Sequence, residues 1–103
     1  MGVAKDLEAC KADLAKAKGF IDKNNPEEAS KVVDAVDKKL DTLADVYNKK
    51  TQQNMTNIKK LSTTIDELQK LLDKHPFEPS KAAGVCAAAA SAAGTAASAA
   101  AAS

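Results

Sequence analysis

The feature that most constrains this chain is an apolar residue at every third or fourth position through three separate segments. This spacing places the apolar side chains on one face of an α-helix, whereas a half-buried β-strand would show a period of two. Charged residues fill most of the intervening positions, so each predicted helix has one apolar and one polar face. The apolar positions are Val3, Leu7, Cys10, Leu14, Ala17 and Ile21, then Ala29, Val33, Val36, Leu40, Leu43 and Tyr47, then Ile58, Leu61, Ile65, Leu68 and Leu72.

Residues that favour helix ends set the boundaries of the first two helices, near 3–23 and 26–48. Asn25 is suited to an N-cap, and Pro26 is suited to the first helical position. Glu28 stands three residues after Asn25, where its side chain can reach back and complete a capping box. We therefore expect the second helix to begin at Pro26.

A polar stretch separates the second apolar stripe from the third. Residues 48–54 contain no apolar side chain, and the pattern resumes in a helix predicted near 55–74. Because neither glycine nor proline interrupts the stretch, one long central helix over 26–74 is an alternative. We favour a turn, because segments of similar length suit an up-down bundle.

The last part of the chain follows a clear break at Pro76 and Pro79, which cannot continue a helix. Ser80 is then a candidate N-cap for a fourth helix near 81–102. From residue 82 onward the chain contains only Ala, Ser, Gly, Thr, one Val and one Cys. A membrane span and a disordered tail are alternatives. We favour a packed helix, because Ala is the strongest helix former and gains little on transfer to lipid.

These elements predict an all-α protein, an antiparallel up-down bundle. Four helices are favoured, and three helices with one long central helix are the alternative. The length of 103 residues fits a single domain. Within it, residues 1–79 form the amphipathic core, and residues 80–103 form an Ala/Ser-rich helix packed on the same domain.

The charge pattern argues against nucleic-acid binding. The formal net charge is +1, and every basic side chain except one histidine is a lysine. Arginine, which recognises phosphates and base edges through two parallel hydrogen bonds, is absent, as is tryptophan. We therefore expect no nucleic-acid partner.

The two cysteines, Cys10 and Cys86, could form a disulfide or remain free. Cys10 lies on the apolar stripe of the first helix, which favours a buried free thiol. A disulfide requires Cα atoms within about 7 Å, whereas in an up-down bundle the two cysteines would be offset by about 10 Å along the axis. An intramolecular disulfide is the alternative.

No residue pattern indicates catalysis, a metal or a cofactor. His75 is the only histidine, so no ligand pair accompanies it. The neighbouring acids Glu27–Glu28 and Asp66–Glu67 do not share a helix face, and no glycine-rich phosphate loop is present. The tripeptide at Asn54 matches a glycosylation sequon, located in the predicted turn. We expect a non-enzymatic protein with Asn54 as its one candidate modification site.

These absences favour a structural or docking subunit that presents helical faces to a protein partner or to another copy of itself. Its four-three apolar spacing is also the one that coiled-coil packing requires. The alternative function is a carrier of an apolar ligand, such as a lipid, held between the helices. A membrane contact through residues 82–103 is less favoured. The start of the chain is charged and lacks the apolar stretch of a signal peptide, so we expect a soluble protein of unassigned compartment.

Overall fold

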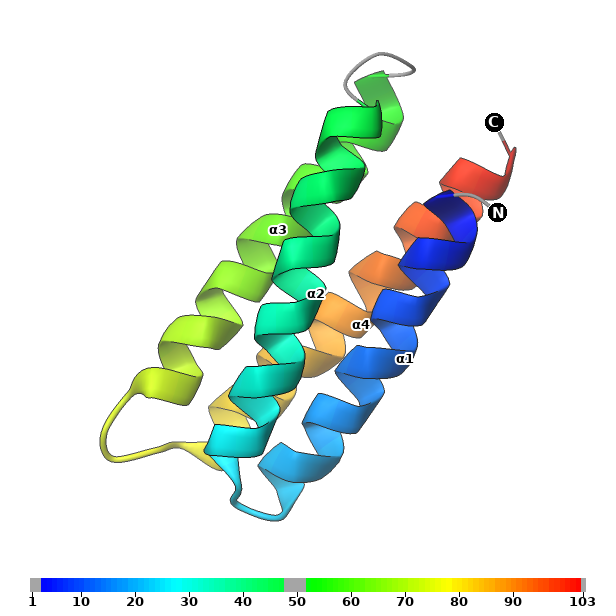
Figure 1. Ribbon diagram of the computed structural model, residues 1–103. Coiled ribbons are helices and arrows are strands. Elements are labelled where there is room, and N and C mark those ends of the chain that lie inside the picture. Colours follow the sequence, from blue (N-terminus) through cyan, green and yellow to red (C-terminus); the bar gives the residue numbers. More distant parts are fainter. Residues whose placement is uncertain (1–2, 48–51, 103) are drawn as a thin grey trace.

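The computed structural model describes residues 3–47 and 52–102, and their side chains over 3–43 and 55–101. Within these ranges the chain forms four helices and no strand. They run up and down as an antiparallel bundle whose Cα atoms extend over 41 × 18 × 18 Å (Figure 1). The prediction of an all-α, four-helix bundle is confirmed. The helices are α1 (Val3–Asp22), α2 (Pro26–Tyr47), α3 (Gln52–Asp73) and α4 (Pro79–Ala102).

The alternative of a single helix over 26–74 is wrong. The second helix ends at Tyr47, the third begins at Gln52, and the two pack against each other in opposite directions. A continuous helix of this length would leave both apolar stripes facing water, whereas folding back lets each stripe bury the other. α3 begins three residues earlier than predicted, because a polar first turn needs no apolar contact to form.

The apolar stripes predicted from the sequence form the core. Every residue of the three stripes whose side chain is described is buried, except Val3, which is partly buried at the end of the bundle. In α4 the buried positions follow the same three-four spacing, although the sequence there consists mainly of alanine. These α4 residues are Ala82, Cys86, Ala89, Ala93, Ala96 and Ala97.

The helices form a ring in which α4 lies between α1 and α3. Among the described residues, α1 is adjacent to α2 and α4, α3 is adjacent to the same two helices, and the Cα atoms of the diagonal pairs are more than 8 Å apart. The α1–α4 contact is the most extensive of the four (Figure 1). Small side chains explain this, because they let the two backbones approach closely.

Asparagine, and not glycine, ends α1. The N–H of Asn25 donates to the carbonyl of Phe20 over 2.8 Å, and the N–H of Asn24 donates to that of Ile21 over 2.9 Å. This pair of bonds is a Schellman motif, and Asn24 occupies its left-handed position with φ of 59°. Gly19 lies inside the helix, and its carbonyl accepts a hydrogen bond from the N–H of Lys23.

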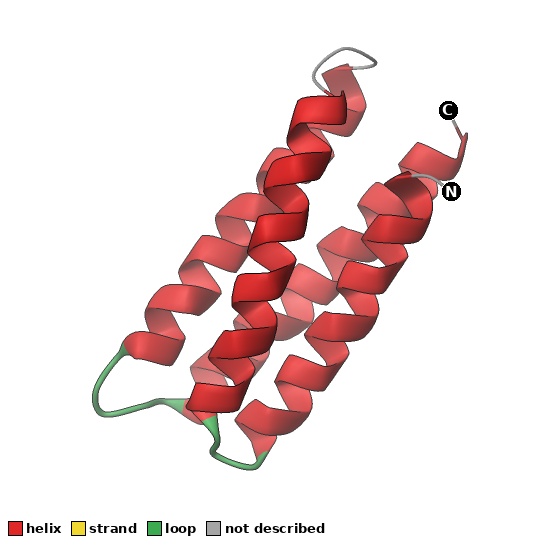
Figure 2. Cartoon of the chain, in the orientation of Figure 1, coloured by secondary structure: helices red, strands yellow, loops and turns green. Residues whose placement is uncertain are grey.

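The start of α2 contains half of the expected capping box. Asn25 Oδ1 accepts a hydrogen bond from the N–H of Glu28 over 3.4 Å, which is the contact an N-cap makes. The Glu28 carboxylate does not reach back. It lies 3.5 Å from Lys31 Nζ, because the N–H of Asn25 already donates to Phe20. Loops 23–25 and 74–78 lie at the same end of the bundle (Figure 2).

The prediction that Ser80 is the N-cap of α4 is wrong, because the helix begins one residue before it. α4 begins at Pro79, and the N–H of Ala82 donates to the carbonyl of Glu78 over 3.1 Å. Glu78 therefore occupies the N-cap position, and Ser80 lies inside the first turn. Proline favours this arrangement, because its fixed φ and missing N–H both suit the first helical position.

Replacing Asn24 tests the end of α1. Asn24→Ala should lower the free energy of unfolding by about 1 kcal/mol, because the left-handed conformation is costly for a residue with a plain Cβ. Asn24→Gly should keep or raise stability. Urea unfolding monitored by circular dichroism measures both. Equal stability of the two variants would contradict the Schellman motif.

A second prediction tests the packing of α4. Ala89→Leu should lower the free energy of unfolding by about 1–3 kcal/mol, because Ala89 is fully buried and the added atoms would separate α4 from its neighbours. The neighbouring Ala88 is exposed, so Ala88→Leu should change stability by less than about 0.5 kcal/mol. Thermal melts of both variants measure the difference. If the two melted alike, α4 would not pack as described.

Candidate docking surface on the fourth helix

The outward side of α4 is exposed and carries no charge beyond its first turn. Lys81 is the only charged residue in the helix. We call the exposed residues that follow it the α4 outer face. They are Gly84, Ala87, Ala88, Ser91, Thr95, Ser98 and Ala101.

Charged side chains dominate the exposed sides of the other three helices but not this one. α1 alone exposes Lys5, Glu8 and Lys16, among others. A protein surface usually intersperses charges of both signs, which keeps the molecule soluble and monomeric. A helix-long uncharged strip is therefore a departure from an ordinary solvated surface.

The bundle requires neither glycine of α4, Gly84 on the outer face or Gly94 beside Lys11 of α1. A Cβ added at Gly84 would meet nothing within 4 Å, and one at Gly94 would lie in ordinary contact with the Lys11 side chain, 3.5 Å from Nζ. Neither has a positive φ. Each glycine costs about 1 kcal/mol of helix stability relative to alanine. The internal packing of the protein gives no reason for this cost.

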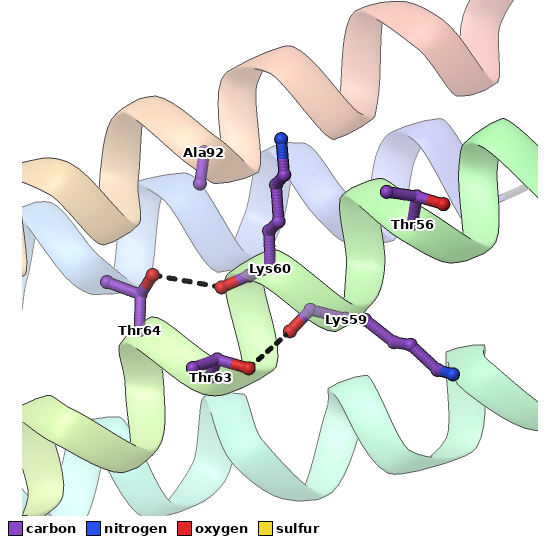
Figure 3. A pocket seen from close by; sticks show the side chains of 6 residues that line it. All are labelled: Thr56, Lys59, Lys60, Thr63, Thr64 and Ala92. Carbon is purple, nitrogen blue, oxygen red and sulfur yellow. Dashed lines mark hydrogen bonds between the residues drawn. The ribbon is translucent and has the colours of Figure 1, made fainter.

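A shallow groove of about 500 Å³ lies between α3 and α4, beside the α4 outer face (Figure 3). Two of its threonines use their hydroxyls within their own helix: Thr63 donates to the carbonyl of Lys59 and Thr64 to that of Lys60, over 3.0 and 2.9 Å. This local bonding satisfies the hydroxyls and leaves their methyl groups as apolar surface. The lining residues are Thr56, Lys59, Lys60, Thr63, Thr64 and Ala92.

A second open groove, of about 630 Å³, lies between the start of α2 and the end of α3. It includes His75, which is exposed, together with the oppositely charged side chains of Glu27, Lys31 and Asp73. In the described part of the chain, no three side chains of His, Cys, Asp or Glu are grouped so that they could hold a metal ion. This groove therefore presents no chemistry that a solvated surface lacks.

Both cysteines are free and fully buried. The Cys86 thiol donates a hydrogen bond to the carbonyl of Leu14 on α1 over 3.1 Å. Burial, the largest effect, raises the pKa of each thiol from 9.0 to about 11. Because the thiolate is the reactive form, neither cysteine is a nucleophile at neutral pH.

The helix register explains why the alternative of a Cys10–Cys86 disulfide is not formed. Lys11 lies across from Gly94, and Leu14 lies across from Cys86. The first contact places Cys10 nine residues from the level of Cys86 and the second places it four residues away, so the two average to an offset of about 10 Å along the bundle axis. That average exceeds the Cα separation of about 7 Å at which a disulfide can close.

The candidate glycosylation residue, Asn54, does not lie in a turn. The backbone places it in the first turn of α3, and its side chain lies outside the described residues. The neighbouring acids Glu27 and Glu28 also separate, since Glu28 binds Lys31 while Glu27 lines the second groove.

By length and composition, the segment Pro79–Ala101 is apolar enough to cross a membrane. About a third of the residues in its most apolar stretch are buried inside the bundle, on the side of α4 that faces α1 and α3. A core helix of a bundle meets the same criteria, so composition alone does not distinguish the two. Burial accounts for the alanines on the inward side of this segment but not for the absence of charge on its outward side.

Comparison with known proteins gives no match: no family model, no curated protein and no solved structure is similar to this chain. Its surfaces are therefore interpreted from their chemistry. The α4 outer face is the one that ordinary solvation does not explain.

Thiol burial makes a prediction about stability at alkaline pH. Between pH 9 and 11 the unfolded chain loses thiol protons that the folded chain keeps, so the free energy of unfolding should fall as pH rises. Each thiol should contribute a loss of about 2 kcal/mol. The variant Cys10→Ala/Cys86→Ala retains every lysine and should lose less stability over the same range. Urea unfolding at several pH values measures both slopes, and equal slopes would contradict thiol burial.

Proposed function

We propose that this protein is a non-enzymatic docking subunit that binds a protein partner through the α4 outer face. The observation that supports the proposal is the absence of charge from this exposed, helix-long strip. An uncharged face of small side chains suits a helix of a partner, because the two backbones can approach closely. Gly84 on this face fits the same role, because nothing in the bundle packs against it and a partner helix would offset its cost in helix stability.

The chemistry of the strip favours a protein over a lipid surface. Ala, Gly and Ser have few apolar atoms, so inserting this face into a membrane would remove little apolar area from water. Packing against a complementary helix gains close van der Waals contact as well. A protein partner therefore uses these residues better than a membrane does.

The alternative of an apolar-ligand carrier finds less support. Such a carrier would hold its ligand in an enclosed chamber lined by apolar side chains. Both described grooves are open to solvent and include lysines. The positions between the helices are occupied by closely packed Leu, Ile, Val and Ala side chains. Docking is therefore the function we favour.

Site-specific photo-crosslinking in cells of the source organism tests the proposal. A photoreactive residue at Ser91 or Ser98 should give a discrete protein adduct, because both lie on the α4 outer face. The same residue at Ala12 or Ala35, on the exposed sides of α1 and α2, should give no such adduct. Gel mobility and mass spectrometry identify the products.

A charge placed on the strip provides the matched control. Ala88→Lys should abolish the adduct formed from Ser91 and leave the melting temperature nearly unchanged, because Ala88 is exposed. Adducts formed equally from all four positions, or adducts that persist in the Ala88→Lys variant, would rule out the α4 outer face as the docking surface.

A further inference from the structure

The exposed side of α3 carries charges of opposite sign on either side of Thr63. Lys59 and Lys60 stand about one turn before Thr63, and Asp66 and Glu67 stand about one turn after it. All five residues are exposed. We call them the α3 outer strip.

Each lysine shares a side of the helix with one of the acids. Lys60 points toward α4, near Ala92, whereas Lys59 points toward α2 (Figure 3). Residues seven apart lie on the same side of an α-helix. Glu67 is therefore on the α4 side with Lys60, and Asp66 is on the α2 side with Lys59.

The lysines of the α3 outer strip form no ion pair with any described residue. The residues three and four positions before and after Lys59 and Lys60 are all uncharged. In the described part of the chain, neither lysine forms an ion pair, whereas Lys18, Lys31 and Lys81 do. Two ammonium groups, one on each side of the helix, are thus left without an ion-pair partner among the described residues.

The other half of the strip adjoins an excess of negative charge. Asp66 lies close enough to Asp37 on α2 to affect its titration. Burial and then the like charges of Asp41, Asp66 and Asp34 raise the pKa of the Asp37 carboxyl. Lys70 follows Asp66 by four residues and, within the described ranges, makes no ion pair with it.

We infer that the α3 outer strip binds the same strip of a second copy of this chain. The two copies are related by a two-fold axis that lies between their Thr63 residues. With the two α3 helices antiparallel, Lys59 would face Asp66 of the second copy, and Lys60 would face its Glu67. Because a two-fold contact is reciprocal, the dimer would contain four such pairs. On each side of the helix the lysine and the acid lie about equally far from Thr63. One axis therefore brings all four pairs together.

This self-association is independent of the proposed docking function, because it uses α3 and leaves the α4 outer face open. Exposed ion pairs contribute little individually. The dimer is therefore weak and sensitive to salt, and it forms at high protein concentration. Its specificity comes from charge complementarity, since a parallel or shifted arrangement would place like charges opposite each other.

Two charge-reversed variants test the inference by sedimentation equilibrium. The wild-type chain should show a mass that rises with concentration toward that of a dimer at about 0.01 M ionic strength, and stay monomeric at about 1 M, where charges are screened. Lys59→Glu/Lys60→Glu and Asp66→Lys/Glu67→Lys should each be monomeric at low salt. Mixed in equal amounts, the two variants should form a heterodimer tighter than the wild-type dimer, because all four pairs are restored. Circular dichroism checks that each variant folds.

Matched controls separate this contact from general charge attraction. Lys5→Glu/Lys16→Glu changes the net charge equally on the exposed side of α1, so this variant should dimerise as the wild type does and bind Asp66→Lys/Glu67→Lys only weakly. Ala88→Lys should leave the dimer intact. A wild-type chain that is monomeric at low salt, a mixture of the α3 variants that fails to associate, or a dimer lost through Ala88→Lys would each overturn the inference. The last result would instead place self-association on the α4 outer face.

Discussion

The close approach of α4 to α1 is the contact on which the bundle depends. Alanine buries far less area than leucine, so an alanine helix gains stability only where its backbone comes near its neighbour. The hydrogen bond from the Cys86 thiol to the carbonyl of Leu14 requires such proximity, because a cysteine side chain is short. The Lys11 side chain resting on Gly94 indicates the same closeness at another level of the bundle. Larger side chains at Ala89 or Ala93 would push α4 away from α1 and break both of these contacts.

The inward side of α4 explains its alanines, but the outward side does not need them. Lys, Glu and Gln form helices nearly as well as Ala, so charged residues could occupy the exposed positions at little cost. The other helices show this arrangement, with alanine, leucine or valine inside and charges outside. Neither helix propensity nor core packing therefore accounts for an uncharged exterior on α4. A contact outside the single chain accounts for it, and this reasoning leads to the docking proposal.

The sequence predicts the fold well where side chains differ in polarity and poorly where they do not. In α1 to α3, every predicted core residue with a described side chain except Val3 is buried, because apolar residues recur every three or four positions among charged ones. In α4 almost all residues are small and uncharged, so no periodicity identifies Ala89 as buried and Ala88 as exposed. That assignment depends on how the helix is rotated against α1, a tertiary property. The outward face of α4 was consequently predictable as uncharged but not by residue.

Helix ends show a second limit of prediction from sequence. Asn24, Pro79 and Ser80 are all compatible with several cap positions, and the path of the loop decides among them. The first helix was predicted near 3–23, and a pair of hydrogen bonds to the carbonyls of Phe20 and Ile21 ends it at Asp22. The charge pattern about Thr63 is different, since it is visible in the sequence. Its meaning required the structure, which shows that Lys59 and Lys60 point toward different neighbouring helices.

The order of the helices around the ring links the two proposed surfaces. α4 is adjacent to α3, on the side of the α3 outer strip toward which Lys60 points. A two-fold axis through Thr63 and perpendicular to α3 keeps α4 of both copies on that same side, running in opposite directions. The dimer would therefore present two α4 outer faces to one partner surface. Binding through both raises the effective concentration of the second contact, which compensates for the small apolar area that each face offers.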